Sequence, residues 1–287
     1  MICGIELKFL VEDSENPAKP DLWTEHGLSV LVNIELNGTR SKVLFDTGAS
    51  GKALLHNAQI MGVNLRDVDV IVLSHGHYDH TGGLLAAIDE AKKQLPIPIV
   101  VHPDALRKKF ALKPHLWFTG IPFPEFEVEI IGGRFMITSK PVEIIEDVIT
   151  TGEIERITKF EKTPEDYVMF KDGEIVRDHM LDDQALIIKY GEKGLVILTG
   201  CAHAGVINTV RYAKKITGES KIYALAGGFH LMDASEDRIE KTVEALKNFN
   251  PRIIAPCHCT GGRAIGRIRE EFRDHFVEVH VGTTLKF

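Results

Sequence analysis

The sequence lacks the features that mark several large classes of protein. It has only four cysteines in 287 residues, too few for a disulfide framework at this size. No apolar run reaches membrane-spanning length, and residues 1–8 lack the basic and apolar regions of a signal peptide. The formal net charge of −7 gives no basic footprint for nucleic acid. We therefore expect a cytoplasmic protein that binds neither membranes nor nucleic acid.

What is present is the composition of an ordinary globular chain, 44% hydrophobic and 26% charged. The length permits one large domain or two small ones. No linker rich in proline, glycine or serine divides the chain, and no short repeat is visible. We therefore expect a single domain over residues 1–287.

Hydrophobic patterning predicts hairpinned strands first and alternating strands and helices later. Asn37-Gly38, between two strand-like runs, is a strong hairpin signal, whereas the stretch 110–134 is irregular. The predicted strands are 5–11, 28–36, 42–45, 68–73, 96–101, several within 134–155, 168–175, 184–190, 195–199, 222–225, 253–255 and 277–281, and the predicted helices are 52–61, 84–94, 206–216, 236–249 and 263–272. This order favours an α/β protein with two sheets face to face and helices on both outer surfaces.

The densest chemical signal is a loop that packs three imidazoles and a carboxylate into six positions. His75, His77, Asp79 and His80 follow a buried strand, and Thr81-Gly82-Gly83 then opens a helix. Imidazole and carboxylate are the usual ligands of zinc and similar metals. Four such groups would be costly to bury without a cation. This loop is therefore predicted to bind metal.

Alternation within the loop indicates how it divides its ligands. His75 and His77 are two residues apart, so they point the same way in extended backbone. Asp79 and His80 follow after the chain begins to turn and can face a second point nearby. Pairs of metals roughly 3.5–4 Å apart are a known hydrolytic design. We therefore expect two divalent ions, with zinc first and manganese, iron or nickel as alternatives.

Three later strands also end in histidine or cysteine. Residues 195–199 lead to Cys201 and His203, 222–225 lead to His230, and 253–255 lead to His258. We expect His203 and His258 to be metal ligands. His230 stays open between a ligand, a ligand-supporting residue and a substrate contact.

These motifs, with Phe45-Asp46-Thr47-Gly48 one helix upstream, resemble the metallo-β-lactamase superfamily. The resemblance covers most of the chain and implies a four-layer αββα sandwich with a dinuclear metal site at the sheet edges. It implies that Asp46 is not a ligand but supports the metal loop through backbone hydrogen bonds. His258 matches the last ligand of the family.

The chain departs from the common family pattern at the end of strand 195–199. Most members have Gly-Asp there, and that aspartate bridges the metals, whereas this chain has Gly200-Cys201. A Cys201 thiolate is one possible bridge, because metals lower thiol pKa values. The other reading makes Cys201 a buried apolar residue and leaves the site to His203. His179 lies where many members place a further ligand, and it is open between that role and an exposed loop position.

The combination of Gly200–Gly205, Gly227–His230 and Cys257–Gly261 is similar to the dihydropteroate-synthase-like branch of the superfamily. We expect first a dinuclear hydrolase that acts on an ester or phosphoester through a metal-activated water, with Asp79 and His203 catalytic. The branch implies an alternative, a transferase that joins a dihydropterin diphosphate to a ribofuranosyl-aminobenzene phosphate. A non-catalytic metal-bearing sensor or partner module is the third possibility.

Two further segments suggest how a small phosphorylated substrate is held. Gly261, Gly262 and Arg263 open a helix directly after His258, and helix N-termini attract anions. A substrate phosphate there competes with a plain glycine-rich turn and a solvated arginine. The aromatic stretch 117–126 is either a lid that stacks on a flat ring or a surface loop packed under itself.

Overall fold

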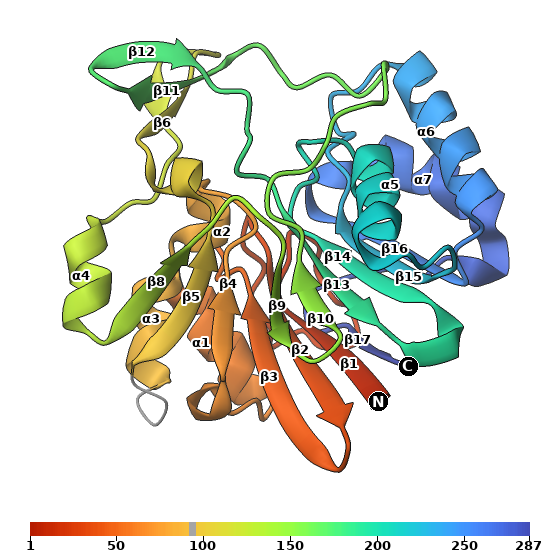
Figure 1. Cartoon of the computed structure of the whole chain (residues 1–287), viewed down its shortest axis with the longest axis horizontal. Helices are drawn as coiled ribbons and strands as arrows, with labels where there is room; N and C mark the ends of the chain where they lie inside the picture. Colours follow the sequence, from red (N-terminus) through yellow and green to blue (C-terminus); the bar gives the residue numbers. More distant parts are fainter. Residues whose placement is uncertain (92–95) are drawn as a thin grey trace.

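Two β-sheets form the centre of the protein in this computed structural model, which describes residues 1–91 and 96–287. The first sheet has seven strands in the order β17-β1-β2-β3-β4-β5-β8. Their bounds are β1 Ile2–Val11, β2 Ser29–Leu36, β3 Thr39–Phe45, β4 Val70–Val72, β5 Ile97–Val101, β8 Gly133–Ile137 and β17 Thr284–Lys286. Because β17 pairs antiparallel with β1, the two chain ends lie close together (Figure 1).

The second sheet has six strands in the order β16-β15-β14-β13-β10-β9. Their bounds are β9 Val142–Ile145, β10 Val148–Thr150, β13 Ala185–Lys189, β14 Leu195–Thr199, β15 Ile222–Gly228 and β16 Ile253–Cys257. The strands β14, β15 and β16 run parallel to one another. Their carboxyl ends therefore share one edge of the sheet, and this edge carries the later cysteine and histidine motifs.

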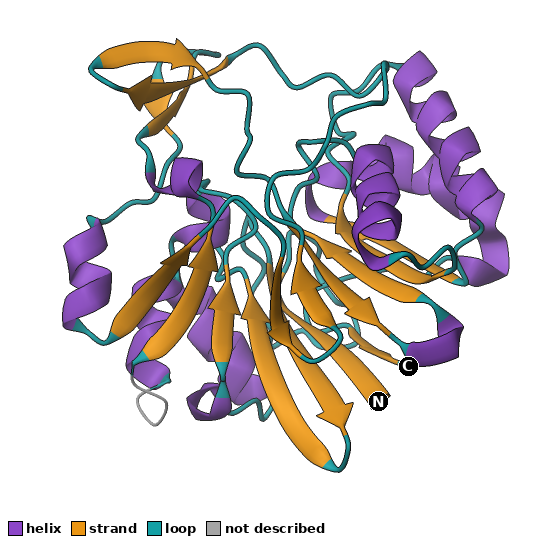
Figure 2. Cartoon of the chain, viewed as in Figure 1, coloured by secondary structure: helices purple, strands orange, loops and turns teal. Residues whose placement is uncertain are grey.

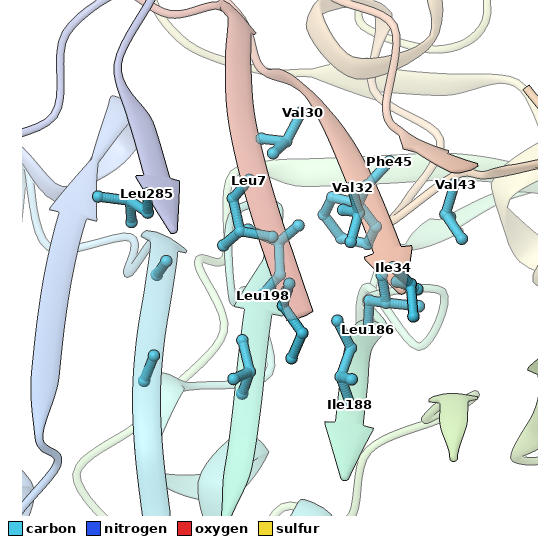
Figure 3. Close-up of a cluster of buried hydrophobic side chains, with 14 of the residues drawn as sticks. Leu7, Val30, Val32, Ile34, Val43, Phe45, Leu186, Ile188, Leu198 and Leu285 are labelled. Carbon is cyan, nitrogen blue, oxygen red and sulfur yellow. The ribbon is translucent and has the colours of Figure 1, made fainter. Parts of the chain in front are cut away.

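The main core lies between the two sheets. Leu7, Val30 and Val32 of the first sheet and Leu186 and Leu198 of the second belong to one buried cluster (Figure 3). Alternation along each strand sends every second side chain to this interface. Each such side chain contributes about 1.5–3 kcal/mol through burial.

Helices cover the outer face of each sheet. The first sheet is covered by α1 (Gly51–Ile60), α3 (Leu84–Glu90) and α4 (Glu125–Ile130), the second by α5 (Val206–Thr217), α6 (Glu236–Phe249) and α7 (Gly262–Phe272) (Figure 2). The expected αββα layering is therefore confirmed. None of the helices in residues 1–91 and 96–287 combines the length and apolarity of a membrane span.

A third, small sheet stands apart from the sandwich (Figure 1). It has the order β12-β11-β6-β7, with β6 Lys109–Ala111, β7 Trp117–Phe118, β11 Tyr167–Lys171 and β12 Glu174–Arg177. In the stretch expected to be irregular, 110–134, the chain thus forms most of β6, all of β7, and α4. Strands of two or three residues are too short to show a periodic pattern, so only tertiary pairing reveals them.

The hairpin turn is confirmed, because Asn37 and Gly38 both have positive φ, 52° and 81°. The strand predicted over 277–281 is wrong: no strand forms there, the one isolated bridge joins Ile254 to the preceding residue Phe276, and the last strand is β17. Val279 and Val281 are buried there without β-strand pairing. The alternation of apolar residues therefore indicated burial and not a strand. The predicted end of helix 84–94 lies outside the described residues, although α3 itself ends at Glu90.

Candidate metal centre

The predicted metal loop lies where the two sheets meet. It follows β4 and turns through the one-turn helix α2 (Tyr78–Thr81), which carries Asp79 and His80. The His80 ring lies with its centroid 4.2 Å from that of His75. The four side chains are buried, with His77 at 6% and Asp79 at 7% exposure. Gly200 at the end of β14 meets the loop, since a Cβ there would lie 2.0 Å from the Ser74 Oγ. Only glycine permits this close approach of the two loops.

Two groups of potential ligand atoms converge at this point. One is His75, Cys201 and His203, the other is His80, Cys201 and His258, and the atoms of each group lie within 4.8 Å of one another. In the second group, His80 Nε2 lies 3.2 Å from both His258 Nε2 and Cys201 Sγ. Asp79 Oδ2 adds a carboxylate oxygen 3.5 Å from each of those two imidazoles. Ligands about 2.0–2.3 Å from one zinc ion are spaced roughly 3–4 Å apart.

Unpartnered nitrogen atoms test whether a cation fits here. Both ring nitrogens of His203 and the Nε2 of His77 are buried without a hydrogen-bond partner among the described residues. Such atoms cost about 1–3 kcal/mol each when left unsatisfied. Burial, the largest cause, lowers the pKa of His203 well below its ordinary value and that of His77 to about 4. Neutral imidazole is the form that binds metals, so this donor set fits divalent cations.

Carboxylates hold the second group in place. Asp46 accepts hydrogen bonds from the Ser74 backbone N–H at 2.7 Å and from the Ser74 hydroxyl at 2.6 Å. It also lies 2.7 Å from His80 Nδ1. A carboxylate on Nδ1 fixes the tautomer and leaves Nε2 free for a metal. These contacts match the supporting role that the family resemblance implies for Asp46.

The N-terminal segment supplies a second carboxylate that the sequence reasoning missed. Asp13 lies 2.7 Å from His258 Nδ1 and 2.8 Å from His26 Nδ1, and Glu12 accepts from the His258 backbone N–H at 2.8 Å. Burial opposes ionisation of Asp13, but hydrogen bonds from His258 and His26 outweigh it and lower its pKa. A signal was present, since Glu12-Asp13 directly follows the apolar run that forms β1.

His26 was also missed, and it brings a further imidazole to the mouth of the site. Its Nε2 lies 3.5 Å from Asp79 Oδ2, while its Nδ1 faces Asp13. The hydrogen bond with Asp13 is the largest cause that raises the pKa of His26. Burial opposes ionisation of Asp79, yet the charge of His80 and the bond with His258 hold its pKa far below the usual range. Asp79 is therefore an anion that faces three imidazoles.

A buried ion cluster supports the metal loop from the other side. Lys109 Nζ lies 2.6 Å from Asp178 and 3.0 Å from Asp182, and Asp182 accepts from the Gly76 N–H at 2.8 Å. Lys109 begins β6, so this cluster connects the small sheet to the metal loop. Asp183 holds the loop that carries His203, because its carboxylate accepts a hydrogen bond from the Ala204 N–H at 2.9 Å.

The cysteines have distinct places. Cys201 is shared by both ligand groups, and burial raises the pKa of its thiol well above the ordinary value. Cys259 faces the same cavity: burial raises its pKa, but the Cys201 side chain and His258 bring it to about 7. Cys257 instead packs in the core between the sheets. The choice between a ligand and an apolar role for Cys201 stays a prediction.

A cavity of about 220 Å³ opens over the two ligand groups. His230 lines it, with its ring centroid 4.2 Å from that of His203, but it belongs to neither group. Tyr78, Trp117 and Tyr167 also line it.

The structure does not bring the remaining predicted residues to this cavity. His179 is exposed and lies in none of the ligand groups found among the described residues. Arg263 pairs with Glu236 at 2.9 Å and donates to the Ala234 carbonyl, and neither it nor Gly261 or Gly262 lines the cavity. An arginine already paired with a carboxylate is less available to a phosphate, and the anion contact stays a prediction.

Comparison with known proteins agrees with this geometry. The family model of the metallo-beta-lactamase superfamily matches residues 23–258. The chain is 38% identical, over 99% of its length and 97% of the relative, to a Methanocaldococcus jannaschii protein named 7,8-dihydropterin-6-methyl-4-(beta-D-ribofuranosyl)-aminobenzene-5'-phosphate synthase. It is 34% identical to an uncharacterized protein of the same organism, over 96% of this chain and 98% of that protein.

A solved structure is also similar along nearly its whole length. It is described as a metal-dependent hydrolase of the beta-lactamase superfamily, and it matches with 31% identity and a TM-score of 0.81 over 98% of both chains. The family model and the relatives agree with the resemblance found in the sequence motifs. The chain belongs to the metallo-beta-lactamase superfamily.

Proposed function

We propose that this protein is a metal-dependent transferase that joins a dihydropterin diphosphate to a ribofuranosyl-aminobenzene phosphate. The observation that carries the proposal is the 38% identity, over 99% of the chain, to the synthase of Methanocaldococcus jannaschii. The sequence motifs alone favoured hydrolysis, which is the general activity of the metal loop. The relationship along the full length reverses that order.

The reaction requires one bond to form as another breaks. A nucleophilic atom of the acceptor, an amine nitrogen or a ring carbon, attacks the methylene carbon on the pterin ring. The C–O bond to the diphosphate breaks, and its electron pair leaves with the diphosphate. The proton lost by the nucleophile must pass to a base. The site must therefore stabilise an anionic leaving group and accept one proton.

The chain's own residues meet both needs. His75, His77 and His203 would hold one cation, expected to be zinc. Asp79, His80 and His258 would hold a second, and Cys201 is common to both ligand groups. Bound divalent cations would supply positive charge to the leaving diphosphate. His26 Nε2, which lies 3.5 Å from Asp79 Oδ2 at the mouth, is the group placed to receive the proton.

Hydrolysis is the second candidate. The support is the solved structure described as a metal-dependent hydrolase, which shares 31% identity and a TM-score of 0.81 with this chain. In that case Asp79 would hold the proton of an attacking water. A simple aryl phosphodiester or phosphonate ester would be a substrate.

The two candidates differ in their dependence on the acceptor. We expect purified, zinc-loaded protein to release diphosphate from a dihydropterin diphosphate only when the aminobenzene acceptor is present. Asp79→Asn should lose this release, and a chelator should abolish it reversibly. Release without acceptor, together with cleavage of an aryl phosphodiester that Asp79→Asn loses, would instead establish hydrolysis.

A further inference from the structure

The cavity over the ligand groups has aromatic walls that come from two parts of the fold. Tyr78 belongs to the metal loop, whereas Trp117 and Tyr167 belong to the small sheet. Tyr167 pairs with Ala111 and Ala111 pairs with Trp117. Residues paired across antiparallel strands share a face, so the register turns Tyr167 and Trp117 to the same side. We name Tyr78, Trp117 and Tyr167 the aromatic slot.

Ring contacts and one hydrogen bond position the side chains of the aromatic slot. The Tyr167 ring stacks on the His77 imidazole, with centroids 5.4 Å apart and an interplanar angle of 29°. The Trp117 ring meets Tyr78 edge to face at 5.8 Å. The indole N–H of Trp117 donates to the Lys113 carbonyl of its own loop. Trp117 nevertheless remains 37% exposed, so ring surface is left for a ligand.

Two polar groups beside the slot have no hydrogen-bond partner in the described part of the chain. The Thr119 hydroxyl is buried, with the residue 2% exposed, and has no hydrogen-bond partner within the described chain. The backbone of Thr119 is already used, because its N–H donates to Lys109 and its carbonyl accepts from Tyr78. The Asp233 carboxylate lines the same cavity, and none of its oxygens makes a hydrogen bond or ion pair with residues 1–91 or 96–287. A ligand with a polar edge would satisfy the buried Thr119 hydroxyl and replace water at the exposed Asp233 carboxylate.

We propose that the aromatic slot, with Thr119 and Asp233 at its edge, binds the bicyclic pterin ring of the substrate and not the aminobenzene ring. This inference rests on the proposed function. A fused pyrimidine ring presents an amino group, a ring N–H and a carbonyl in one plane, and a carboxylate accepts two parallel N–H bonds. A substituted benzene ring offers no such edge.

The cavity size agrees with one ring system. Its volume of about 220 Å³ is below the roughly 300–1,000 Å³ of sites that enclose a whole drug-sized ligand. The pterin therefore occupies the slot, its methylene carbon faces the ligand groups, and the acceptor approaches from the open side. His26 and Asp79 line that mouth.

Tryptophan fluorescence provides a readout that needs no turnover. The chain has two tryptophans, and Trp23 stacks on His56 at 3.9 Å away from the slot. In Trp23→Phe protein, Trp117 is the sole reporter. We expect 6-hydroxymethyl-7,8-dihydropterin to quench it saturably and p-aminobenzoate to leave it unchanged. Trp117→Phe protein, which keeps Trp23, corrects for light absorbed by the pterin.

A matched pair of variants tests the register. Trp117→Ala removes the fluorescent reporter, so equilibrium dialysis measures pterin binding by this variant and by its control. Trp117→Ala should weaken pterin binding by roughly tenfold, the scale of one lost stacking contact. Phe118→Ala changes the next residue, on the opposite face of β7, and should leave binding within about twofold. Thr119→Val should weaken binding and keep the fold.

The outcomes separate this inference from the proposed function. Acceptor-dependent diphosphate release without quenching by the pterin would overturn the slot and keep the transferase. Quenching by the pterin without release would keep the slot and overturn the transferase. Quenching by p-aminobenzoate alone, or equal effects of Trp117→Ala and Phe118→Ala, would overturn the assignment of the ring.

Discussion

The two ligand groups share Cys201 but differ in the side chains that hydrogen-bond to their imidazoles. In one, which we name the braced group, Asp46 faces His80 Nδ1 at 2.7 Å and Asp13 faces His258 Nδ1 at 2.7 Å. In the other, the unbraced group of His75 and His203, no carboxylate faces an imidazole among the described residues. Within residues 1–91 and 96–287, His75 Nδ1 faces only the Ser74 hydroxyl, and neither ring nitrogen of His203 has a partner.

This difference concerns orientation more than charge. A carboxylate on Nδ1 fixes the tautomer and the ring angle before a metal arrives, so less freedom is lost on binding. An imidazole without a partner must be ordered by the metal itself. We therefore expect the braced group to bind its ion more tightly and to keep it when the other group is empty.

Removal of a ligand should give the largest effect. His80→Ala should lose the braced ion and all acceptor-dependent diphosphate release, a larger loss than the roughly 10–100-fold that supporting residues cost. His203→Ala or His77→Ala should lose only the unbraced ion. Elemental analysis of the metal content per chain measures the loss of either ion. Wild-type protein with a single metal that survives His77→Ala would break the two-ion model.

Removal of a brace should have the next largest effect. Asp46→Asn and Asp13→Asn should each weaken binding at the braced group by about 10–100-fold, because His80 or His258 loses its fixed tautomer. Competition with a chelating dye measures the dissociation constant. Ser74→Ala, which touches His75 of the unbraced group as well as Asp46, should cost less. Equal losses in all three variants would contradict the role of the braces.

Cys201 is the residue that the two ligand groups have in common. If its sulfur binds metal, Cys201→Ser should weaken affinity at both groups by at least about tenfold. The cobalt-substituted protein should also lose its sulfur-to-metal absorption band. The exposed Cys3 provides a control, and Cys3→Ser should change neither. Full metal content and activity in Cys201→Ser would leave Cys201 as a packing residue.

The stability of the protein should depend on pH through Glu161, which lies next to the unbraced group. This carboxylate accepts from the Ile207 and Asn208 N–H groups at the start of α5, just after the His203 loop, and burial raises its pKa to about 7. A raised carboxyl pKa means that the folded state binds a proton that the unfolded state has released. The free energy of unfolding should therefore fall by about 2 kcal/mol as pH rises from 5 to 7. Glu161→Gln should flatten this dependence in thermal melts of the metal-free protein, and an unchanged slope would exclude Glu161 as its source.

Arg263 should give the smallest effect. Because its guanidinium pairs with Glu236 at the surface, Arg263→Ala should change KM for the phosphorylated substrate by less than about twofold. Stability should change by less than about 1 kcal/mol. A tenfold rise in KM at constant kcat would restore the anion contact that the sequence suggested.

Features that depend on neighbours in the chain were predictable. The metal loop needs only six consecutive residues, and the hairpin needs only Asn37-Gly38, so each pattern carries its own structure. Alternation along long strands also predicted the four layers, because burial of every second side chain demands a facing sheet. Family resemblance added the supporting role of Asp46.

Features that depend on distant neighbours were decided only by the tertiary structure. Asp13 and His258 are 245 residues apart, and no local pattern relates them. The short strand β6 pairs with β11, and β7 pairs with β6, and these two registers together bring Trp117 and Tyr167 to one face. Glu236 similarly takes Arg263 away from the cavity. Sequence determines which groups are available, whereas hydrogen bonds and packing contacts act only over a few ångströms, so folding determines which of them meet.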